Sequence, residues 1–384
     1  MDDGEAPLSW YREIRKETPF LFGLLTLAVF VSLGNSWHVD HSLELVRAGM
    51  LVWLLAVILY CIFGVVRHAD QLAEILGEPL GTLILTISVT VIEVSLISAV
   101  MFEGISDPTL ARDTMFAVVM IMLNGMVGLA LLAGGFRHIQ QEYNLEGARA
   151  YLAVLIPLAV IALILPDWTT STAAGTMSLA QTIFFSVATV MLYGIFLALQ
   201  TMRHRGFFLE PTLLAEQLQA EDPEVPPTPP ADRRRAIVWH AAMLFLTMVP
   251  IVGLAEYLAV IVEHGLNELN IPTAIGGILI ASLILAPESI TALEAALANR
   301  LQRSINLCLG SALATLALTV PFVLMIGLVT GTDIKLGLEN ENAVLLMLTI
   351  LVSMLTFGGG RTNMLQGAVH ILLFLSFLLL IFSP

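Results

Sequence analysis

Blocks of about 20 successive apolar residues constrain this chain most strongly, because a helix of that length crosses roughly 30 Å of hydrocarbon. Only 12% of its 384 residues are charged, and the mean hydropathy is +0.88. A soluble domain carries about 25% charged residues. These values exclude a soluble enzyme, a disordered protein and a coiled coil, and they predict an all-α polytopic membrane protein.

The apolar blocks predict about eleven transmembrane helices. Their uninterrupted runs are typical of helices, since the strands of membrane barrels alternate apolar and polar residues. Lipid also leaves no partner for a backbone group outside helices and closed barrels. The expected spans are 20–35, 48–66, 79–102, 114–134, 150–166, 179–200, 237–262, 272–296, 304–330, 343–357 and 364–382.

The distribution of basic residues predicts the orientation. With the N-terminus in the cytosol, 14 of the 17 basic residues fall on the cytosolic side, and only Arg47, Arg112 and Lys335 fall outside. This bias follows the positive-inside rule. We expect a bacterial cytoplasmic (inner) membrane, with the N-terminus cytosolic and the C-terminus outside. The net charge of −14 argues against a nucleic-acid partner, which leaves membrane lipid and transported ions.

A Pro-rich acidic segment at 203–236 divides the chain and is typical of a cytosolic linker. We expect a cytosolic segment at 1–19 and a leading helix at 20–36, followed by five-helix repeats at 45–202 and 237–384. A repeat with an odd number of helices inverts its second copy. Many secondary transporters have this architecture, with the ion site at the midplane between repeats.

Two intramembrane glutamates are the most informative residues. Glu93 is the only charged residue in 81–100, and Glu288 is the only one in 271–293. They fall in the equivalent second helices of the two predicted repeats. A carboxylate at this depth costs roughly 2.5–3.5 kcal/mol to insert, so it normally faces the protein interior or a wet cavity. Two facing carboxylates that bind either a cation or protons would allow cation/proton exchange. Glu93 and Glu288 are the predicted ligands of the cation and of the protons.

Nearby oxygen atoms are candidate auxiliary ligands, since hard cations take carboxylate, hydroxyl and carbonyl oxygens. Serine and threonine are also ordinary packing residues in membrane helices. The candidate ligands are Thr86, Thr90, Ser95, Thr291 and Asn306, and the candidate cytosolic entrance is Glu74 and Glu78. Asn124 could supply another amide oxygen, whereas His370 is interpreted as a packing residue. No HExxH, GxSxG or P-loop pattern occurs, so we expect neither an enzyme nor a bound cofactor.

Several long stretches resemble the calcium/cation antiporter superfamily, in its proton-exchanging CAX branch and most closely its bacterial ChaA-type Ca²⁺(Na⁺)/H⁺ members. The stretches are LGEPLGTLILTISVTVIEVSLISAVM (76–101), ARDTMFAVVMIM (111–122), LYGIFLALQT (192–201), LAPESITALEAALANRLQRSINLCLGSALAT (285–315) and GRTNMLQGAVH (360–370). The resemblance implies eleven helices, inverted repeats and alternating access. It also implies that Glu93 and Glu288 are shared ligands of the cation and the protons.

The sequence departs from that superfamily beside both glutamates. Other branches carry a Gly-Asn pair four and three residues before each glutamate, where this chain has Val89-Thr90 and Ile284-Leu285. The departure favours Na⁺ or K⁺ as alternatives to Ca²⁺, with a Na⁺(K⁺)/H⁺ exchanger of little Ca²⁺ activity as one alternative reading. A cation channel that uses the same carboxylates for selectivity is the other.

Overall fold

The computed structural model describes residues 17–33, 44–76, 80–102, 108–210, 230–269, 271–272, 274–332 and 334–383. Within these residues, eight helices are long and apolar enough to cross a membrane, and three shorter apolar helices accompany them. Together they account for all eleven predicted spans. The all-α membrane fold is therefore confirmed. The expected spans 150–166 and 343–357, the shorter ones after the leading helix, correspond to helical stretches at 145–168 and 340–356.

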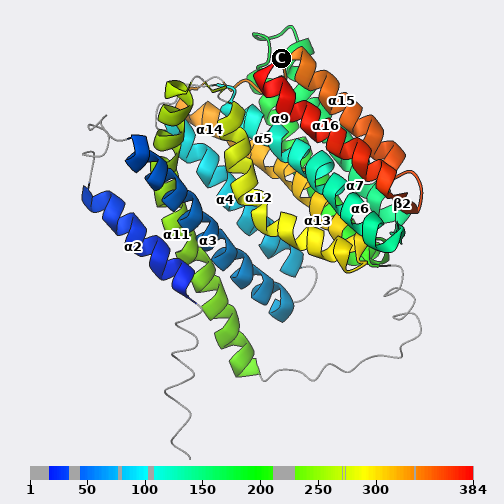
Figure 1. Ribbon diagram of the computed structural model, residues 1–384, viewed down its shortest axis with the longest axis horizontal. Helices are drawn as coiled ribbons and strands as arrows, with labels where there is room; N and C mark the ends of the chain where they lie inside the picture. Colours follow the sequence, from blue (N-terminus) through cyan, green and yellow to red (C-terminus); the bar gives the residue numbers. More distant parts are fainter. Residues whose placement is uncertain are drawn as a thin grey trace, which may run out of the picture. The chain divides into compact units, whose positions relative to one another are not determined.

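The helices group into two compact units, which are described separately. The first unit contains the leading helix α2 (Thr18–Leu33), α3 (Glu44–Leu76), α4 (Leu80–Phe102) and α11 (Pro230–Glu268). The long helix α11 packs along α3 and also contacts α2 and α4 (Figure 1). The contact with α2 is close, since a Cβ at Gly23 would lie 2.9 Å from Pro250.

The second unit contains the remaining helices and two short strands (Figure 1). Its α-helices are α5 (Leu110–Met120), α6 (Val127–His138), α7 (Leu145–Ala159), α8 (Leu165–Trp168), α9 (Leu179–Ala198), α12 (Ala274–Leu297), α13 (Leu301–Ala314), α14 (Val320–Thr330), α15 (Asn340–Thr356) and α16 (Met364–Phe382). Helix α12 packs against α5 and α13, and α16 packs against α6. The unit also contains the 3₁₀ turn η5 (Arg205–Phe208).

Four membrane helices of the second unit contain a π-helical turn that the sequence did not predict. These turns are η2 (Ile121–Met126), η3 (Val160–Ile164), η4 (Leu199–Arg203) and η6 (Thr315–Thr319). Two of them, η2 and η6, interrupt the third helices of the two predicted repeats, which supports their equivalence. A π turn inside an α-helix occurs frequently at functional sites.

The two strands pair at one end of the second unit. Strand β1 (Gln140–Glu142) runs antiparallel to β2 (Arg361–Asn363), with Gln141 opposite Thr362. The Arg361 guanidinium reinforces the pair, since its Nη2 lies 2.6 Å from Glu142 Oε1. This pairing ties the segment after α6 to the segment before α16.

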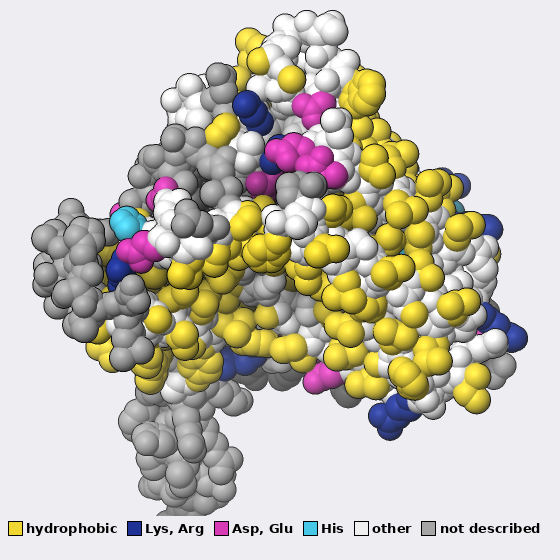
Figure 2. Space-filling model, turned by 45° about the horizontal axis from the view of Figure 1, so that its top comes forward, with side chains coloured by type: hydrophobic (Ala, Val, Ile, Leu, Met, Phe, Trp, Pro, Cys, Tyr) yellow, Lys and Arg dark blue, Asp and Glu magenta, His cyan; other side chains and the backbone are white. Residues whose placement is uncertain are grey.

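The surface of the helices has the character expected of a protein in lipid. Figure 2 shows hydrophobic side chains gathered over the face drawn there, with most charged side chains above and below them. Helix α9 is an example, since only 22% of the residues in its most apolar stretch are buried within the protein. In water this surface would be costly to expose, whereas lipid tails solvate it.

The predicted division into two repeats and a linker remains a prediction. Helices α3 to α9 span 44–198 and helices α11 to α16 span 230–382, yet the first compact unit takes helices from both predicted repeats. Of the predicted linker, residues 211–229 lie outside the described residues, as do residues 1–16 of the predicted N-terminal segment. Helix α11 begins at Pro230, so the arginine triplet at 233–235 is helical.

The close packing of α16 on α6 gives a testable prediction. A Cβ at Gly367 would lie 2.7 Å from the backbone N of Leu132 and 2.9 Å from the carbonyl oxygen of Gly128. Backbone atoms cannot give way as a flexible side chain would, so Gly367→Ala should lower the free energy of unfolding by about 1–3 kcal/mol. Thermal unfolding of the purified protein in detergent measures this change.

The control is Gly194→Ala in α9, where a Cβ would meet nothing within 4 Å. Alanine is the better helix former, so this variant should match the wild type or gain up to about 1 kcal/mol. Equal unfolding temperatures for the two variants would contradict the proposed close contact.

Candidate functional site

Glu93 is almost fully buried in the middle of α4. Its exposed fraction is 2%, and the neighbouring Ile92 and Ile97 are buried as well. Within the first unit, α4 packs against α3 and α11. A carboxylate at such a position needs either a counter-charge, a proton or a cation, because burial of an isolated charge is strongly unfavourable.

The residues predicted to assist Glu93 differ in their surroundings. Thr90, one helical turn before Glu93, is 5% exposed and lies on the same side of α4. Ser95 is directed along its own helix, since its Oγ donates to the carbonyl oxygen of Val91 at 2.6 Å. Thr86 belongs to α4, but its side chain lies outside the described residues.

The predicted cytosolic entrance is only partly described. Glu74 is exposed near the end of α3, where its Oε2 accepts a hydrogen bond from Gln71 Nε2 at 3.3 Å. Glu78 lies outside the described residues. The role of both glutamates in guiding cations therefore stays a prediction.

Glu288 lies on helix α12 in the second unit. Helix α12 packs against α5, η2, α6 and α13. Its approach to α5 is close, since a Cβ at Gly277 would lie 3.0 Å from the backbone N of Thr114. Glu288 itself is half-buried and follows the buried Pro287. Proline has no N–H, so the helical hydrogen bond to the carbonyl oxygen of Leu283 is absent and that oxygen can serve another partner.

Thr291 and Asn306, two predicted auxiliary ligands of the cation, form hydrogen bonds with other residues in this structure. Thr291 Oγ1 donates to the carbonyl oxygen of Pro287 at 2.9 Å. Asn306 Oδ1 accepts from Gln302 Nε2 at 2.8 Å, and its Nδ2 donates to the carbonyl oxygen of Phe208 at 2.7 Å. Each would have to exchange these bonds before it could ligate a cation.

Helix α13 supplies a neighbour of Glu288 that the sequence did not single out. The Cys308 thiol lies within electrostatic reach of the Glu288 carboxyl group and hydrogen-bonds with Ser304. Cys308 is fully buried. The two residues are 20 positions apart in the sequence, so only the packing of α13 on α12 brings them close.

A fully buried polar network occupies the core of the second unit. Asn124, on the π turn η2, donates from Nδ2 to Thr349 Oγ1 at 2.8 Å. His370 Nδ1 lies 3.1 Å from Asn124 Oδ1, and His370 Nε2 lies 3.0 Å from Thr356 Oγ1. The amide oxygen can only accept, so His370 carries a proton on Nδ1 and accepts from Thr356 at Nε2. The network therefore joins η2 to α15 and α16.

The same face of α15 carries a further polar side chain. Ser353 follows Thr349 by four residues and is fully buried. Its Oγ makes no hydrogen bond within the described part of the chain. Thr349, Ser353 and Thr356 thus form a polar stripe beneath Asn124 and His370. The Tyr143 hydroxyl donates to the carbonyl oxygen of Gly359 and lies 3.4 Å from that of Thr356. Burial raises the pKa of this tyrosine to about 12, so it remains a donor at neutral pH.

A second buried cluster joins three helices of the first unit. Glu17 Oε2 lies 2.9 Å from His68 Nε2 and 3.1 Å from Arg67 Nη2. The other ring nitrogen of His68, Nδ1, lies 3.0 Å from Nδ1 of His240 on α11. This cluster connects the start of α2 with α3 and α11, so the leading helix has a specific polar attachment.

Among the described residues, eleven apolar helices and the buried or half-buried glutamates Glu93 and Glu288 are the features of a polytopic membrane ion transporter. The family model described as sodium/calcium exchanger protein matches residues 46–202 and 239–383, most of the chain. The chain therefore belongs to this exchanger family, and the expected membership is confirmed.

Individual relatives and solved structures agree with this assignment. The chain is 38% identical to the sodium-potassium/proton antiporter ChaA of Escherichia coli, covering 96% of this chain and 97% of that protein. It is 41% identical to the putative ionic transporter y4hA of Sinorhizobium fredii, over 84% and 86% of the two chains. The fold is similar to native YfkE, with a TM-score of 0.68 at 17% identity over 95% and 100% of the chains. The H⁺/Ca²⁺ exchanger CAX gives 0.66 at 13% identity over 96% and 88%.

The polar network around Asn124 gives a second prediction. In a double-mutant cycle, Asn124→Ala and His370→Ala should be coupled by about 0.6–1.7 kcal/mol in unfolding free energy, the range measured for hydrogen bonds between membrane helices. Both single variants should also lower the unfolding temperature, because each leaves a buried polar partner unsatisfied.

Ser376 is the matched control, since it also lies on α16 but donates to the carbonyl oxygen of Leu372 on its own helix. Asn124→Ala and Ser376→Ala should be additive within about 0.5 kcal/mol. Additivity of the Asn124 and His370 substitutions would show that their hydrogen bond makes no net contribution.

Proposed function

We propose that this chain is a secondary antiporter that moves cations out of the cytosol in exchange for entering protons. Membership of the exchanger family supports this function. So do the names of its relatives, among them a sodium-potassium/proton antiporter and Ca²⁺/H⁺ antiporters. The observation that carries the proposal is the burial of Glu93, since a carboxyl group 2% exposed within an apolar helix needs a functional reason.

In the mechanism that we propose, Glu93 and Glu288 form one site that binds either protons or a cation, but not both at once. Burial disfavours the charged form of each carboxyl group, and a second carboxylate nearby disfavours it further. Protonation removes these costs, and a bound cation offsets them by its opposite charge. The site therefore holds protons or a cation, and the two compete for it.

Coupling follows from the cost of moving charge through a low-dielectric medium. An empty pair of carboxylates would carry two uncompensated charges across the membrane when the site changes its side of access, which is strongly unfavourable. A site neutralised by protons or by a cation avoids this cost. If only the neutralised forms of the site change their side of access, each cation that leaves must be replaced by protons that enter. Cations then cannot leak across without exchange.

The choice of cation is the finer part of the proposal. The relative with 38% identity over nearly the whole chain is named as a sodium-potassium/proton antiporter, whereas the Ca²⁺/H⁺ antiporters of Aphanothece halophytica and Bacillus subtilis are 25% and 23% identical. Thr90 offers a single hydroxyl oxygen one turn before Glu93. We therefore propose Na⁺ or K⁺ exchange beside Ca²⁺ exchange, and the assay below ranks the three ions.

We further propose that the protein lies in a bacterial cytoplasmic membrane with its N-terminus in the cytosol. Reporter fusions test this orientation. A phosphatase that is active only outside the cytosol should be active when fused after Pro384 and inactive when fused after His204, before the segment expected to be the cytosolic linker. Activity in the opposite pattern would reverse the orientation, and activity at both sites would contradict the odd number of spans.

Substitution of the two glutamates tests the proposed mechanism. In everted membrane vesicles with an imposed proton gradient, addition of Ca²⁺, Na⁺ or K⁺ should dissipate the gradient for the wild type. Glu93→Gln and Glu288→Gln should each reduce this response to the level of vesicles without the protein, because glutamine is isosteric but cannot exchange a proton for a cation.

Glu146→Gln is the matched control, since this carboxylate is 57% exposed and, among the residues that the structure describes, forms an ion pair with Arg149 alone at the start of α7. It should exchange cations as the wild type does. Exchange that persists in both Glu93→Gln and Glu288→Gln, at wild-type expression, would remove the proposed mechanism. Cation flux that needs no proton gradient in return would favour the channel instead.

A further inference from the structure

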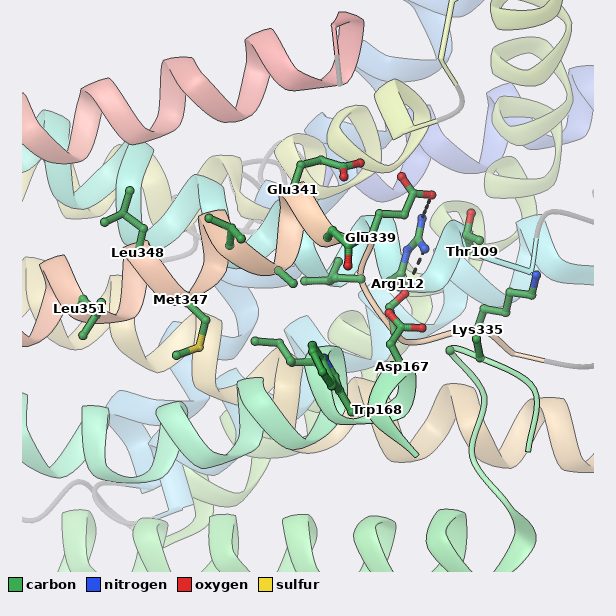
Figure 3. Close-up of a pocket in the computed structure, with 18 residues that line it drawn as sticks. Thr109, Arg112, Asp167, Trp168, Lys335, Glu339, Glu341, Met347, Leu348 and Leu351 are labelled. Atoms are coloured by element: carbon green, nitrogen blue, oxygen red, sulfur yellow. Dashed lines mark hydrogen bonds and ion pairs between the residues drawn. The ribbon is translucent and has the colours of Figure 1, made fainter. Parts of the chain in front are cut away.

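The second unit contains a groove of about 1090 Å³ that the transport mechanism does not use. It lies beside the start of α15, between that helix and the segment formed by η3 and α8 (Figure 3). The residues before α15, from Lys335 to Glu339, line one end of it. Its volume is that of a site for an organic ligand and far exceeds the space that a single ion needs.

One part of the groove is apolar and faces away from the protein core. Val344, Met347, Leu348 and Leu351 recur every three or four residues along one face of α15. Their exposed fractions range from 43% to 68%. The opposite face of α15 is buried against the rest of the unit, where the helix packs on α16 and η2. Since α15 is an apolar membrane span, the exposed face is solvated by lipid tails.

The other end of the groove is polar, and one of its charges is already neutralised. Arg112 donates from Nε to Asp113 Oδ1 at 2.7 Å and from Nη1 to the carbonyl oxygen of Gly337 at 3.1 Å. Its Nη2 lies 3.7 Å from Glu339 Oε1. Burial raises the pKa of Glu339, and the Arg112 guanidinium acts in the opposite direction. These pairs hold the loop before α15 in place and leave Arg112 only 7% exposed.

Three further charged side chains lie at the same end, of which Lys335 and Asp167 are exposed and Glu341 is half-buried. Lys335 and Asp167 lie near each other in Figure 3, and Glu341 lies on the first turn of α15. Lys335 makes no ion pair within the described ranges of the chain. Trp168, 77% exposed, lies between these charges and the apolar wall. Tryptophan is enriched at this level of a membrane, where hydrocarbon meets the headgroups.

Apart from the paired Arg112 and Glu339, the groove therefore offers one cation, two carboxylates and an apolar wall, the groups that a zwitterionic phospholipid with a primary amine would need. We propose that it binds a phospholipid with a primary amine headgroup, of the phosphatidylethanolamine type. The phosphate would pair with Lys335 and the ammonium with Asp167 and Glu341, while the acyl chains lie along Met347, Leu348 and Leu351. Charge complementarity selects this occupant over a purely anionic lipid, because the groove carries more carboxylates than free cations.

Native mass spectrometry of the purified full-length chain tests the proposal. The protein is equilibrated with equal amounts of phosphatidylethanolamine and phosphatidylcholine of the same acyl chains. The quaternary ammonium of phosphatidylcholine has no N–H to donate, so the wild type should retain phosphatidylethanolamine at least about tenfold more often, a difference of about 1.4 kcal/mol. Asp167→Asn should bring the ratio towards one. Lys335→Ala should instead lower the retention of both lipids, because both carry the phosphate that Lys335 would bind.

Two further variants separate this site from general lipid binding. Leu348→Trp should fill the apolar wall and expel the lipid while the charged groups remain. Arg149→Gln changes an exposed charge elsewhere in the unit, with a side chain 55% exposed, and should leave the preference unchanged. Equal retention of the two lipids by the wild type, stronger retention of phosphatidylglycerol in a parallel competition, a preference that survives Asp167→Asn, or unchanged lipid retention in Lys335→Ala would each overturn the proposal.

Discussion

The absence of water from the hydrocarbon core is the constraint on which this structure depends. Every backbone group within the spans has to find its partner inside the chain, which accounts for the helical character of the eleven apolar segments. The same constraint acts on side chains, since a polar group that turns inward has to be bonded. Asn124 illustrates this, because its amide is fully buried and yet bonded to two neighbouring helices.

Glu93 and Glu288 are acidic residues within apolar helices, and their surroundings differ. Glu93 is 2% exposed on a helix that packs against α3 and α11 in the first unit. Glu288 is half-buried on a helix that contacts four others in the second unit, with a proline directly before it. The sequence predicts that their helices are equivalent members of two inverted repeats, yet the surroundings of the two residues are not copies. If both carboxyl groups bind protons and cations as proposed, these different surroundings would give them different affinities.

The sequence predicted the spans well, because the length of an apolar run reflects a dimension of the bilayer. It also located Glu93 and Glu288, since a single charge in 20 apolar residues is visible without any tertiary information. The hydrogen bond of Asn306 was not predictable, because its partner Phe208 is nearly 100 positions away in the sequence. Thr291 bonds to the carbonyl oxygen of Pro287 on its own helix, and the sequence alone does not tell this bond from ligation of a cation. The network of Asn124, Thr349 and His370 was missed for the same reason: each residue alone looks like a common packing residue, and only the folded chain brings them together.

The π turn η2 has a consequence for the helix that contains it. A π turn holds one residue more than an α turn, and in a helix of 3.6 residues per turn that extra residue rotates everything beyond it by about 100°. The segment before the turn, α5, packs mainly on α12, and the segment after it, α6, packs mainly on α16. The two halves of this span therefore pack through differently oriented faces, and the change of orientation occurs at the turn that contains Asn124. Insertion of a single residue is enough to create such a rotation. Deletion of one residue from the turn would rotate one half of the helix away from its present packing partners.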